Sequence, residues 1–469
     1  MQYSLGVIGL GTMGANLARN AARNGAAVSV YNRTAQVTEN FLEEHGAEGE
    51  MKGYKSYKEF VQSLEHPRAI LLMVKAGEAV DAVLRDLLPL LQKGDIILDG
   101  GNSHYPDTQR RTEELAAQGI HFIGMGISGG EEGALQGPSM MPGGNEKAYR
   151  TIEPLLAKMA ADDGEGGKCI AYVGEGGAGH FVKMVHNGIE YGIMQLIAES
   201  AALLKDVGKY TNTQLAETFA AWNTDANLSS FLLEITARIF TKKDAETGGD
   251  LIDFIADSAG QKGTGKWTTE AAMTYGVAIP TINAAVDARI LSGSAEKRTA
   301  HRSLPVALDE QDPVPPPEKL RSIVRNALEL AALCTYGQGF DLIEKASAEE
   351  GWKIDLGEVA RIWRGGCIIR SAFLPLFQAQ YGRGDTVAAT EQLMQRFAGE
   401  KQRDWRRTVT IAASRGIPTP ALSASLHAYD AYRSARLPQN LIQAQRDYFG
   451  AHTYERTDTE GTFHTDWTS

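Results

Sequence analysis

Cysteine is scarce in this sequence: only Cys169, Cys334 and Cys367 occur among 469 residues. Their number is odd, they lie far apart, and none forms a C-x-x-C pair. Neither a disulfide framework nor a zinc cluster fits this distribution. The cysteine content therefore predicts a protein of a reducing compartment, and we expect the cytoplasm.

Long apolar runs and an excess of basic residues are also missing. No run of about 18 apolar residues occurs, so no transmembrane helix is expected. The N-terminal MQYSLGVIGLGTMG lacks the basic and apolar regions of a signal peptide. The formal net charge of −11 argues against binding to nucleic acid or to an anionic membrane. Any anionic ligand must therefore be held by a local group of basic side chains.

The length and the apolar pattern predict several domains. A typical domain has roughly 150 residues, so a chain of 469 should contain two or three. In the first third, short and nearly continuous apolar segments alternate with helical stretches, which predicts a parallel sheet covered on both faces. The expected strands are 3–10, 26–32, 69–74, 95–100, 121–126 and 169–174, with a helix over 13–24. We predict a Rossmann-like α/β domain over residues 1–176.

Beyond the glycine-rich GEGGAGH (174–180) the periodicity becomes helical. We predict a large all-helical domain over 177–437. It should be divided near DPVPPP (312–317), because prolines cannot continue a helix.

The two halves of this helical part are similar to each other. VHNGIEY (185–191) is similar to VRNALEL (324–330), and Trp222 and Trp363 follow the two segments at similar distances. This predicts an internal duplication of one helical unit. Chance similarity between two amphipathic helices is the alternative.

The last segment, 438–469, is polar and shows no helical periodicity. Chain ends of this kind are usually disordered unless something holds them. Its aromatic side chains favour a docked segment instead; they are Tyr448, Phe449, Tyr454, Phe463 and Trp467.

The first expected strand ends in GLGTMG, a G-x-G-x-x-G pattern formed by Gly9, Gly11 and Gly14. Its position between a strand and a helix is the context that predicts a dinucleotide site. The glycines permit a tight turn, close approach of the pyrophosphate and close packing of helix on strand. The alternative is a glycine turn without a ligand.

The end of the second expected strand distinguishes between cofactors. NAD sites usually carry Asp or Glu there, whereas this chain has Asn32, Arg33 and Thr34. Arg33 can pair with a 2′-phosphate, so NADP is favoured over NAD. Two further loops should border the same crevice, VKA (74–76) and the loop that carries Asn102. The predicted cofactor-binding residues are Gly9, Leu10, Gly11, Thr12, Met13, Gly14, Asn32, Arg33, Thr34, Val74, Lys75, Ala76 and Asn102.

We expect a second glycine-rich stretch, 124–144, to form a loop after a strand; it contains Ser128, Gly129 and Gly130. These residues offer a hydroxyl and backbone N–H groups to a carboxylate. A flexible loop between strands is the alternative.

The segment KMVHNGIEY (183–191) brings several polar side chains into one helix. Lys183, Asn187 and Glu190 share a face at 3.6 residues per turn, with His186 and Tyr191 beside them. In the similar helix, Asn and Glu recur but the lysine does not. A solvated helix face is the alternative.

Lysine and glutamate next to a nicotinamide suit an oxidative decarboxylation. A desolvated lysine can take the hydroxyl proton as hydride leaves, and its protonated form then polarises the new carbonyl. A carboxylate β to that carbonyl is then easily lost as CO₂. A glutamic acid with a raised pKa can protonate the carbon of the resulting enediol.

At this point the sequence resembles the decarboxylating 6-phosphogluconate dehydrogenase family, of the long, dimeric, NADP-dependent type. The resemblance covers essentially the whole chain. It rests on GLGTMG, NRT, VKAG, LDGGNSHYPDT, GISGGEEGA, GPSMMPGG, KMVHNGIEY and GQKGTGKWT, in this order.

The resemblance implies catalysis by Lys183 as base and then acid, and by Glu190 as the acid that protonates C1 of the enediol. It also implies NADP as cofactor, no metal, a homodimer, and a place in the pentose phosphate pathway and gluconate utilisation. The tail of one subunit would complete the site of the other. The implied substrate-binding residues are Asn102, Ser128, Gly129, Gly130, His186, Asn187, Tyr191, Lys262, Arg289, Arg446 and His452; the phosphate would be bound by Tyr191, Lys262 and Arg289.

Two other functions remain to be separated from this one. One is a β-hydroxyacid dehydrogenase of the hydroxyisobutyrate or tartronate-semialdehyde type, which shares the glycine pattern but is usually much shorter. The other is a non-catalytic NADP-binding sensor on the same fold. The second helical unit and the basic tail speak against the first, and intact Lys183 and Glu190 against the second.

Overall fold

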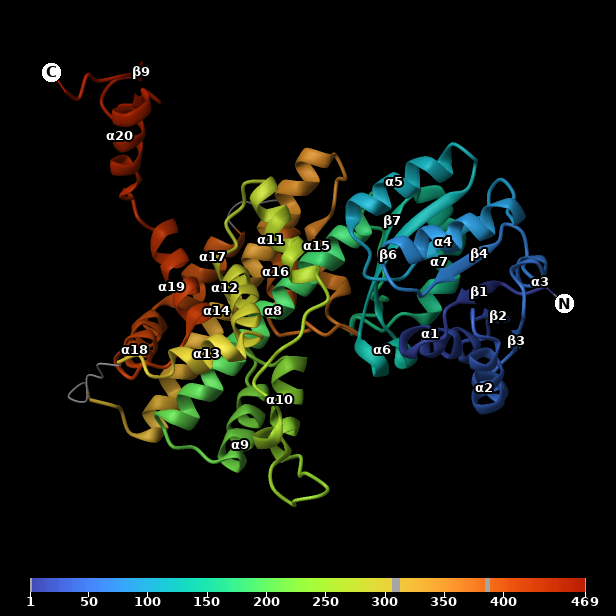
Figure 1. Ribbon diagram of the computed structural model, residues 1–469, viewed down its shortest axis with the longest axis horizontal. Coiled ribbons are helices and arrows are strands. Elements are labelled where there is room, and N and C mark those ends of the chain that lie inside the picture. Colours follow the sequence, from blue (N-terminus) through green and yellow to red (C-terminus); the bar gives the residue numbers. More distant parts are fainter. Residues whose placement is uncertain (1, 306–312, 384–388, 469) are drawn as a thin grey trace.

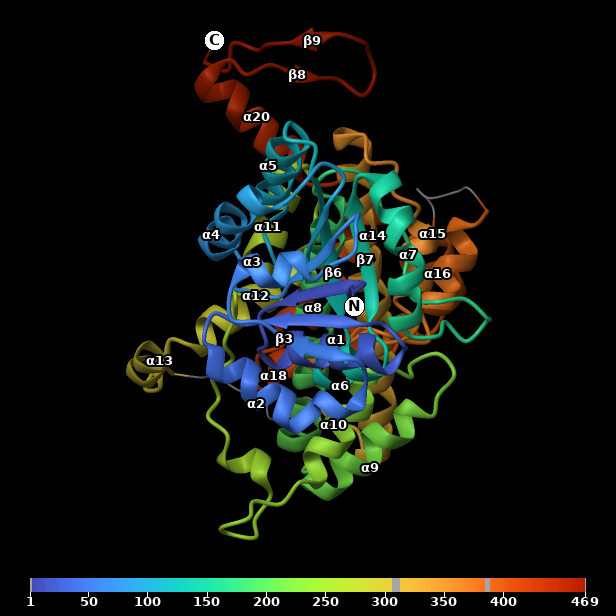
Figure 2. The same ribbon diagram turned by 90° about the vertical axis from the view of Figure 1, so that its right-hand side faces the viewer.

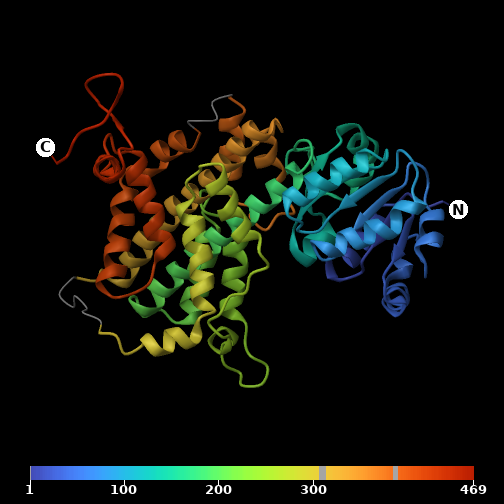
Figure 3. The same cartoon turned by 45° about the horizontal axis from the view of Figure 1, so that its top comes forward.

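The computed structural model describes residues 2–305, 313–383 and 389–468. Two regions lie side by side (Figures 1 and 3). The sheet region runs from β1 to α7, and the helical region from α8 to α19. The tail is formed by α20, β8 and β9. This architecture confirms the predicted class, a Rossmann-like α/β domain followed by a large helical domain.

The sheet has the strand order β3-β2-β1-β4-β5-β6-β7, in which all pairs are parallel except β6 with β7. The strands are β1 (Leu5–Ile8), β2 (Val28–Tyr31), β3 (Met51–Gly53), β4 (Ala69–Leu72), β5 (Ile96–Asp99), β6 (His121–Ser128) and β7 (Ser139–Gly144). The helices between them are α1 (Thr12–Arg23), α2 (Ala35–His45), α3 (Tyr57–Gln62), α4 (Glu78–Leu87), α5 (Tyr105–Ala116), α6 (Gly130–Gln136) and α7 (Glu146–Met159).

Both faces of the sheet are buried, which explains why its strands are apolar throughout. Along β4, Leu71 points into the hydrophobic core shared with α1 and α7, while Ile70 and Leu72 point into the core shared with α3, α4 and α5. Alternate side chains of a strand face opposite sides, so each strand contributes to two cores.

Two expectations for this sheet are wrong. Residues 169–174 form no strand; only Ile170 makes an isolated bridge to Met140. The stretch 124–144 is not a loop, because β6 continues to Ser128, α6 follows, and β7 returns antiparallel. An apolar segment predicts a strand but not its direction or its partner.

The helical region is built on two long helices, α8 (Ala178–Asp206) and α14 (Pro317–Glu350), which pack against each other. Most of α8 is buried, as expected for a helix surrounded by others. The shorter helices are α9 (Asn212–Asn223), α10 (Phe231–Thr241), α11 (Thr264–Thr274), α12 (Pro280–Ser292), α13 (Ala295–His301), α15 (Leu356–Ile362), α16 (Leu374–Tyr381), α17 (Ala389–Ala398), α18 (Lys401–Ser414) and α19 (Pro420–Tyr432).

Each of the two long helices, α8 and α14, is followed by shorter helices. α14 begins at Pro317, a favourable first position for proline. The first residue of the predicted break, Asp312, lies outside the described residues. None of the helices described is long and apolar enough to cross a membrane.

The tail is more regular than its sequence pattern suggests. α20 (Gln439–Gly450) is followed by a hairpin of β8 (Tyr454–Glu455) and β9 (Thr462–Phe463), and both protrude from the body (Figure 2). The buried carboxylate of Asp447 accepts hydrogen bonds from the indole of Trp467 (2.8 Å) and from the backbone N–H of Thr453 (2.8 Å). These bonds tie the chain end to α20.

Candidate functional site

The turn between β1 and α1 holds the glycines of the predicted cofactor site. A Cβ on Gly14 would lie 1.9 Å from the carbonyl oxygen of Gly9, so helix and strand approach too closely for a side chain there. A Cβ on Gly11, at the N-cap of α1, would meet no atom within 4 Å. The open N-terminus of α1 therefore suits the pyrophosphate of a dinucleotide. Leu10 is buried, Met13 half-buried and Thr12 exposed.

The end of β2 lies beside this turn. The side-chain oxygen of Asn32 accepts a hydrogen bond from the backbone N–H of Leu10 (3.1 Å), which joins the two loops. Arg33 and Thr34 are exposed, and no carboxylate occurs between Tyr31 and Thr38. The guanidinium of Arg33 forms no ion pair with another of the described residues, and a guanidinium fits a 2′-phosphate better than a ribose hydroxyl.

The other two cofactor loops follow β4 and β5 at the same end of the sheet. Val74 and Ala76 are half-buried, and Lys75 and Asn102 are exposed. The carboxylate of Asp99 accepts hydrogen bonds from the Ser103 hydroxyl (2.6 Å) and the Gly101 N–H (3.0 Å). The loop that presents Asn102 is thereby held to the end of β5.

The helix α8 packs directly on the sheet near these loops. A Cβ on Gly126 of β6 would lie 2.4 Å from the Cβ of Lys183, so the glycine is what allows this approach. Lys183 is 5% exposed. The predicted face of this helix is therefore not solvated but turned into the protein.

Around Lys183 lies a compact polar cluster. Its Nζ is 3.3 Å from Nδ1 of His186, and that nitrogen is 3.0 Å from Oδ1 of Asn187. Nε2 of His186 is 2.8 Å from the Ser128 hydroxyl. Four of the predicted residues, from β6 and α8, thus form one hydrogen-bonded group.

Cys367 joins this cluster, a contact that no motif in the sequence predicts. Its Sγ lies 3.1 Å from Nε2 of His186 and 3.5 Å from Oγ of Ser128, and the backbone N–H of Ile368 donates to the same hydroxyl (3.2 Å). The contact joins residues far apart in the chain. The only signal in the sequence is the glycine pair directly before this cysteine.

Burial sets the protonation of the two predicted catalytic groups. It lowers the pKa of Lys183, which the negative charge of Glu190 only partly opposes. It raises the pKa of Glu190, against the positive charges of Lys183 and Arg289. It also lowers the pKa of His186 well below its usual value, and the charge of Lys183 adds to this effect. The site thus favours a neutral lysine, a protonated glutamic acid and a neutral imidazole.

A basic group lies next to this pair. The guanidinium carbon of Arg289 is 3.3 Å from the ring centroid of Tyr191, which is the neighbour of Glu190 in α8. Arg289 also donates to the carbonyl oxygen of Gly260 (3.3 Å), in the exposed loop that carries Lys262. Two of the predicted phosphate-binding residues, Tyr191 and Arg289, are therefore in direct contact, and the loop of Lys262 borders them.

Gly129 and Gly130 lie at the start of α6 and are half-buried. Arg446 and His452 are not brought to this site within the chain. Both are exposed on the tail, whose helix protrudes at the end of the molecule away from the sheet (Figure 1). Arg446 donates to Gln443 (2.9 Å), one turn earlier in the same helix.

Comparison with known proteins places these features in a family. A model of the NAD binding domain of 6-phosphogluconate dehydrogenase matches residues 4–174, and one of the C-terminal domain of that enzyme matches residues 179–467.

Relatives match over nearly the whole length. The decarboxylating 6-phosphogluconate dehydrogenase of Synechococcus elongatus is 53% identical over 98% of both chains. The NADP(+)-dependent, decarboxylating enzyme of Bacillus subtilis is 52% identical over 99% of both. A structure of Plasmodium falciparum 6-phosphogluconate dehydrogenase, from a study of apo, NADP+ and substrate forms, superposes with a TM-score of 0.94 at 43% identity, over 99% of this chain and 100% of that one. The resemblance inferred from the motifs is confirmed, and the chain belongs to the 6-phosphogluconate dehydrogenase family.

Proposed function

We propose that this chain oxidises and decarboxylates 6-phosphogluconate to ribulose 5-phosphate and CO₂, with NADP as the hydride acceptor. The observation that carries the proposal is that the buried Lys183 and the half-buried Glu190 lie on one face of the same helix, with opposite shifts in pKa. Each shift moves its group toward the protonation state that a base and an acid need near neutral pH.

Lys183 acts as the base in the first step. Its neutral amine takes the proton of the substrate's C3 hydroxyl, and the ammonium formed then donates a hydrogen bond to the new carbonyl oxygen. That bond withdraws electrons from the carbonyl, so the carboxylate β to it leaves as CO₂. Burial strengthens the bond, because little water competes for either partner.

Glu190 acts as the acid in the last step. Loss of CO₂ leaves an enediol whose C1 must receive a proton. The raised pKa keeps Glu190 protonated before this transfer, and the neighbouring charges of Lys183 and Arg289 stabilise the carboxylate afterwards.

The cofactor site fits a dinucleotide by the open N-terminus of α1 and the closely packed glycine turn. The residues that would hold NADP belong to the glycine turn 9–14, to 32–34, to 74–76 and to the loop of Asn102. When bound, NADP supplies the nicotinamide ring that accepts the hydride. Arg33 holds the 2′-phosphate, with Asn32 and Thr34 beside it.

The substrate is held at both ends. Asn102, Ser128, Gly129, Gly130, His186 and Asn187 bind its carboxylate and hydroxyls. Neutral His186 is oriented through Ser128, Asn187 and the thiol of Cys367. Tyr191, Lys262 and Arg289 bind the phosphate, which gives an acidic protein the local positive charge that this ligand requires.

The active form is a homodimer in which the tail completes the site of the other subunit. Arg446 and His452 cannot serve their own site from a protruding tail, and they would reach the partner's substrate. The exposed apolar side chains of α20 favour this docking: Leu441 and Ile442 are 62% and 53% exposed, Tyr448 and Phe449 60% and 71%.

The proposed division of the chain follows from these roles. Residues 1–176 bind NADP, 177–437 bind substrate and form the dimer from two related helical units, and 438–469 reach the partner subunit. The proposed location is the cytoplasm, where the three cysteines, all free and buried, stay reduced.

The test is a direct comparison of substrates. The purified protein should release NADPH and CO₂ from 6-phosphogluconate and should leave 3-hydroxyisobutyrate unchanged. Activity on the unphosphorylated acid alone would assign it to the hydroxyisobutyrate type. NADP binding without turnover of either acid would make it a sensor.

A further inference from the structure

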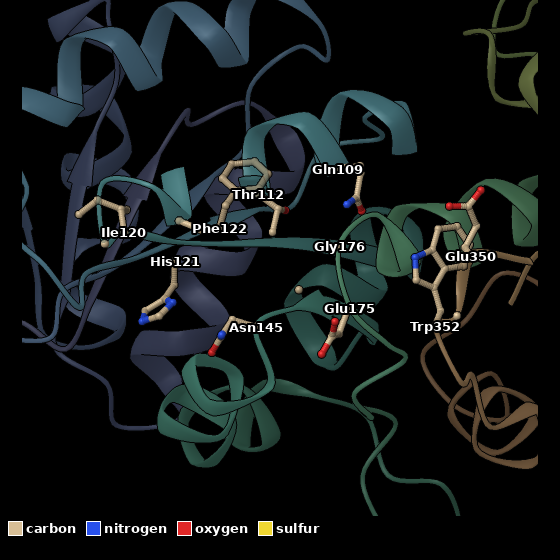
Figure 4. A pocket seen from close by; sticks show the side chains of 14 residues that line it. Gln109, Thr112, Ile120, His121, Phe122, Asn145, Glu175, Gly176, Glu350 and Trp352 are labelled. Carbon is tan, nitrogen blue, oxygen red and sulfur yellow. The ribbon is translucent and has the colours of Figure 1, made fainter. Parts of the chain in front are cut away.

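A separate cavity of about 330 Å³ lies at the junction of the sheet region and the helical region (Figure 4). Its walls are formed by one face of α5, the start of β6, the end of β7, residues 175–176 and the end of α14. The cofactor loops follow the carboxyl ends of the parallel strands, whereas this cavity borders the amino end of β6. It is therefore distinct from the proposed active site.

The indole of Trp352 provides an unused hydrogen-bond donor in this cavity. Trp352 is 7% exposed, and its ring nitrogen points into the open space (Figure 4). The described part of the chain offers this N–H no acceptor. The N–H of a largely buried indole ring normally has one, so the position favours an occupant with an oxygen atom.

The formal charges of the lining are negative. Glu175 and Glu350 contribute exposed carboxylates and His121 an imidazole, and no lysine or arginine of the described residues lines the cavity. One oxygen of Glu350 accepts the hydroxyl of Tyr275 (2.8 Å), which fixes this side chain at the wall. Two carboxylates at the edge of a cavity that no described lysine or arginine lines favour a cation.

The remaining walls favour an organic cation over a metal ion. Among the described residues no group of three or more His, Cys, Asp or Glu side chains is placed to hold a metal. Ala116, Ile120 and Phe122 add apolar surface for a carbon skeleton. The volume is at the lower end of the roughly 300–1,000 Å³ of small-molecule sites.

We propose that this cavity binds a small organic cation, whose ammonium or guanidinium group pairs with Glu175 and Glu350 and whose oxygen accepts the N–H of Trp352. The occupant would touch both regions of the chain. It would also lie against the segment that enters α8, where the backbone N–H of Gly177 donates to the side chain of Gln109 (3.1 Å).

Calorimetric titration with two matched probes tests the charge requirement. N-acetylargininamide carries one guanidinium and two carbonyl oxygens, and N-acetylcitrullinamide replaces the guanidinium with a neutral urea of similar shape. The full-length protein should bind the first at least about tenfold more tightly, the effect of one charge-assisted hydrogen bond. Equal affinity, or no binding of the cationic probe at 20 mM or so, would overturn the proposal.

Variants locate the binding. Glu175→Gln and Glu350→Gln should each weaken binding of the cationic probe about tenfold, and Trp352→Phe about threefold. Glu217→Gln, at an exposed position of α9, is the matched control and should bind as the unaltered protein does. Because Glu175 is exposed, its variant should fold normally and gives a result even if Glu350→Gln does not. Unchanged affinity in Glu175→Gln would place the probe elsewhere and refute the site.

Discussion

The Nζ of Lys183 lies 3.3 Å from Nδ1 of His186, and both side chains are buried one turn apart on α8. His186 gives the lysine a neutral neighbour, because burial lowers the pKa of the imidazole well below its usual value. A carboxylate in this position would hold the lysine charged and remove its value as a base. The pairing thus supports the lowered pKa on which the proposed chemistry depends.

The first prediction concerns the pH dependence of this lysine. Only the neutral amine acts as base, so kcat/KM should rise with pH up to the lowered pKa of Lys183 and level off above it. Above that pKa, Lys183→Ala should lower kcat at least ~100-fold, while NADP still binds. Steady-state rates over pH 5–10, with NADP affinity measured separately, check both statements.

Lys205→Ala is the matched control for this prediction. Lys205 lies in the last turn of the same helix, exposed and paired with Asp253 (2.8 Å). It should retain both rate and pH profile. A Lys183→Ala variant that kept more than a tenth of the activity would show that another group removes the proton.

The second prediction concerns cofactor choice. Arg33→Asp should raise the Kd for NADP roughly 10- to 100-fold, because it removes a charge-assisted contact to the 2′-phosphate and adds a repulsive charge. The Kd for NAD should stay the same or fall, since a carboxylate can accept the ribose 2′-hydroxyl. Fluorescence titration with both cofactors measures the two constants.

Arg85→Asp makes the same charge change at an exposed position of α4 and serves as the control. It should leave both constants unchanged. Parallel losses for NADP and NAD in the Arg33 variant would mean that Arg33 supports the fold of the loop instead of reading the phosphate.

The site could be predicted where its signal is local. The glycine turn, the loop of Asn102 and the face shared by Lys183, Asn187 and Glu190 each lie within a few residues of one strand or helix, so spacing alone places them. Two features of the structure could not be predicted in this way, and for the same reason. Strand direction in β7 and the contact of Cys367 with His186 depend on tertiary pairing between distant segments, which no local period encodes.

The tail, residues 438–469, is a further part of the structure that its sequence did not predict. We expected no helix there, yet α20 forms with Leu441, Ile442, Tyr448 and Phe449 at helical spacing, and the buried carboxylate of Asp447 organises the residues after it. Burial alone would raise the pKa of Asp447, but hydrogen bonds from His464, Trp467 and two backbone N–H groups outweigh it and lower that pKa. The hydrogen bonds to Asp447 therefore order the chain after α20, and the amino-acid composition of the tail does not reveal them.

The third prediction tests whether the tail acts in the partner subunit. Lys183→Ala and Arg446→Ala should each be nearly inactive alone. After the two are mixed, unfolded and refolded together, activity should return. In a mixed dimer one site then combines an intact Lys183 with an intact Arg446 from the other chain.

The mixed dimer distinguishes a tail that acts in the partner subunit from a tail that acts in its own subunit. If the tail served its own subunit, every site would carry one lesion and no activity would return. Arg433→Ala, an exposed arginine just before the tail, should stay active alone and serves as the control. Mixing Lys183→Ala with the unaltered chain calibrates how much activity a half-competent dimer shows.

The fourth prediction concerns stability. Glu199 of α8 accepts hydrogen bonds from the backbone N–H groups of Ala421 and Leu422, each at 2.9 Å. These groups open α19, whose N-cap Thr419 makes no side-chain capping bond. The carboxyl group therefore caps a helix from a distant part of the chain, and Glu199→Ala should cost about 2–4 kcal/mol by leaving two buried donors unpaired.

The same carboxyl group should make stability depend on pH. Burial raises the pKa of Glu199 to about 7, although the backbone hydrogen bonds oppose this. The folded protein therefore holds a proton that the unfolded chain releases at about pH 4.3. Its contribution to stability is complete below that value and is lost as the pH rises toward 7. Between pH 5 and 8, the unfolding free energy should fall by about 2 kcal/mol relative to Glu199→Gln, which cannot titrate.

Urea unfolding at one fixed protein concentration measures the unfolding free energies of the unaltered protein and of Glu199→Gln. Glu217→Gln should track the unaltered protein at both pH values, and a constant gap for Glu199→Gln would show that this group is already ionised at pH 5.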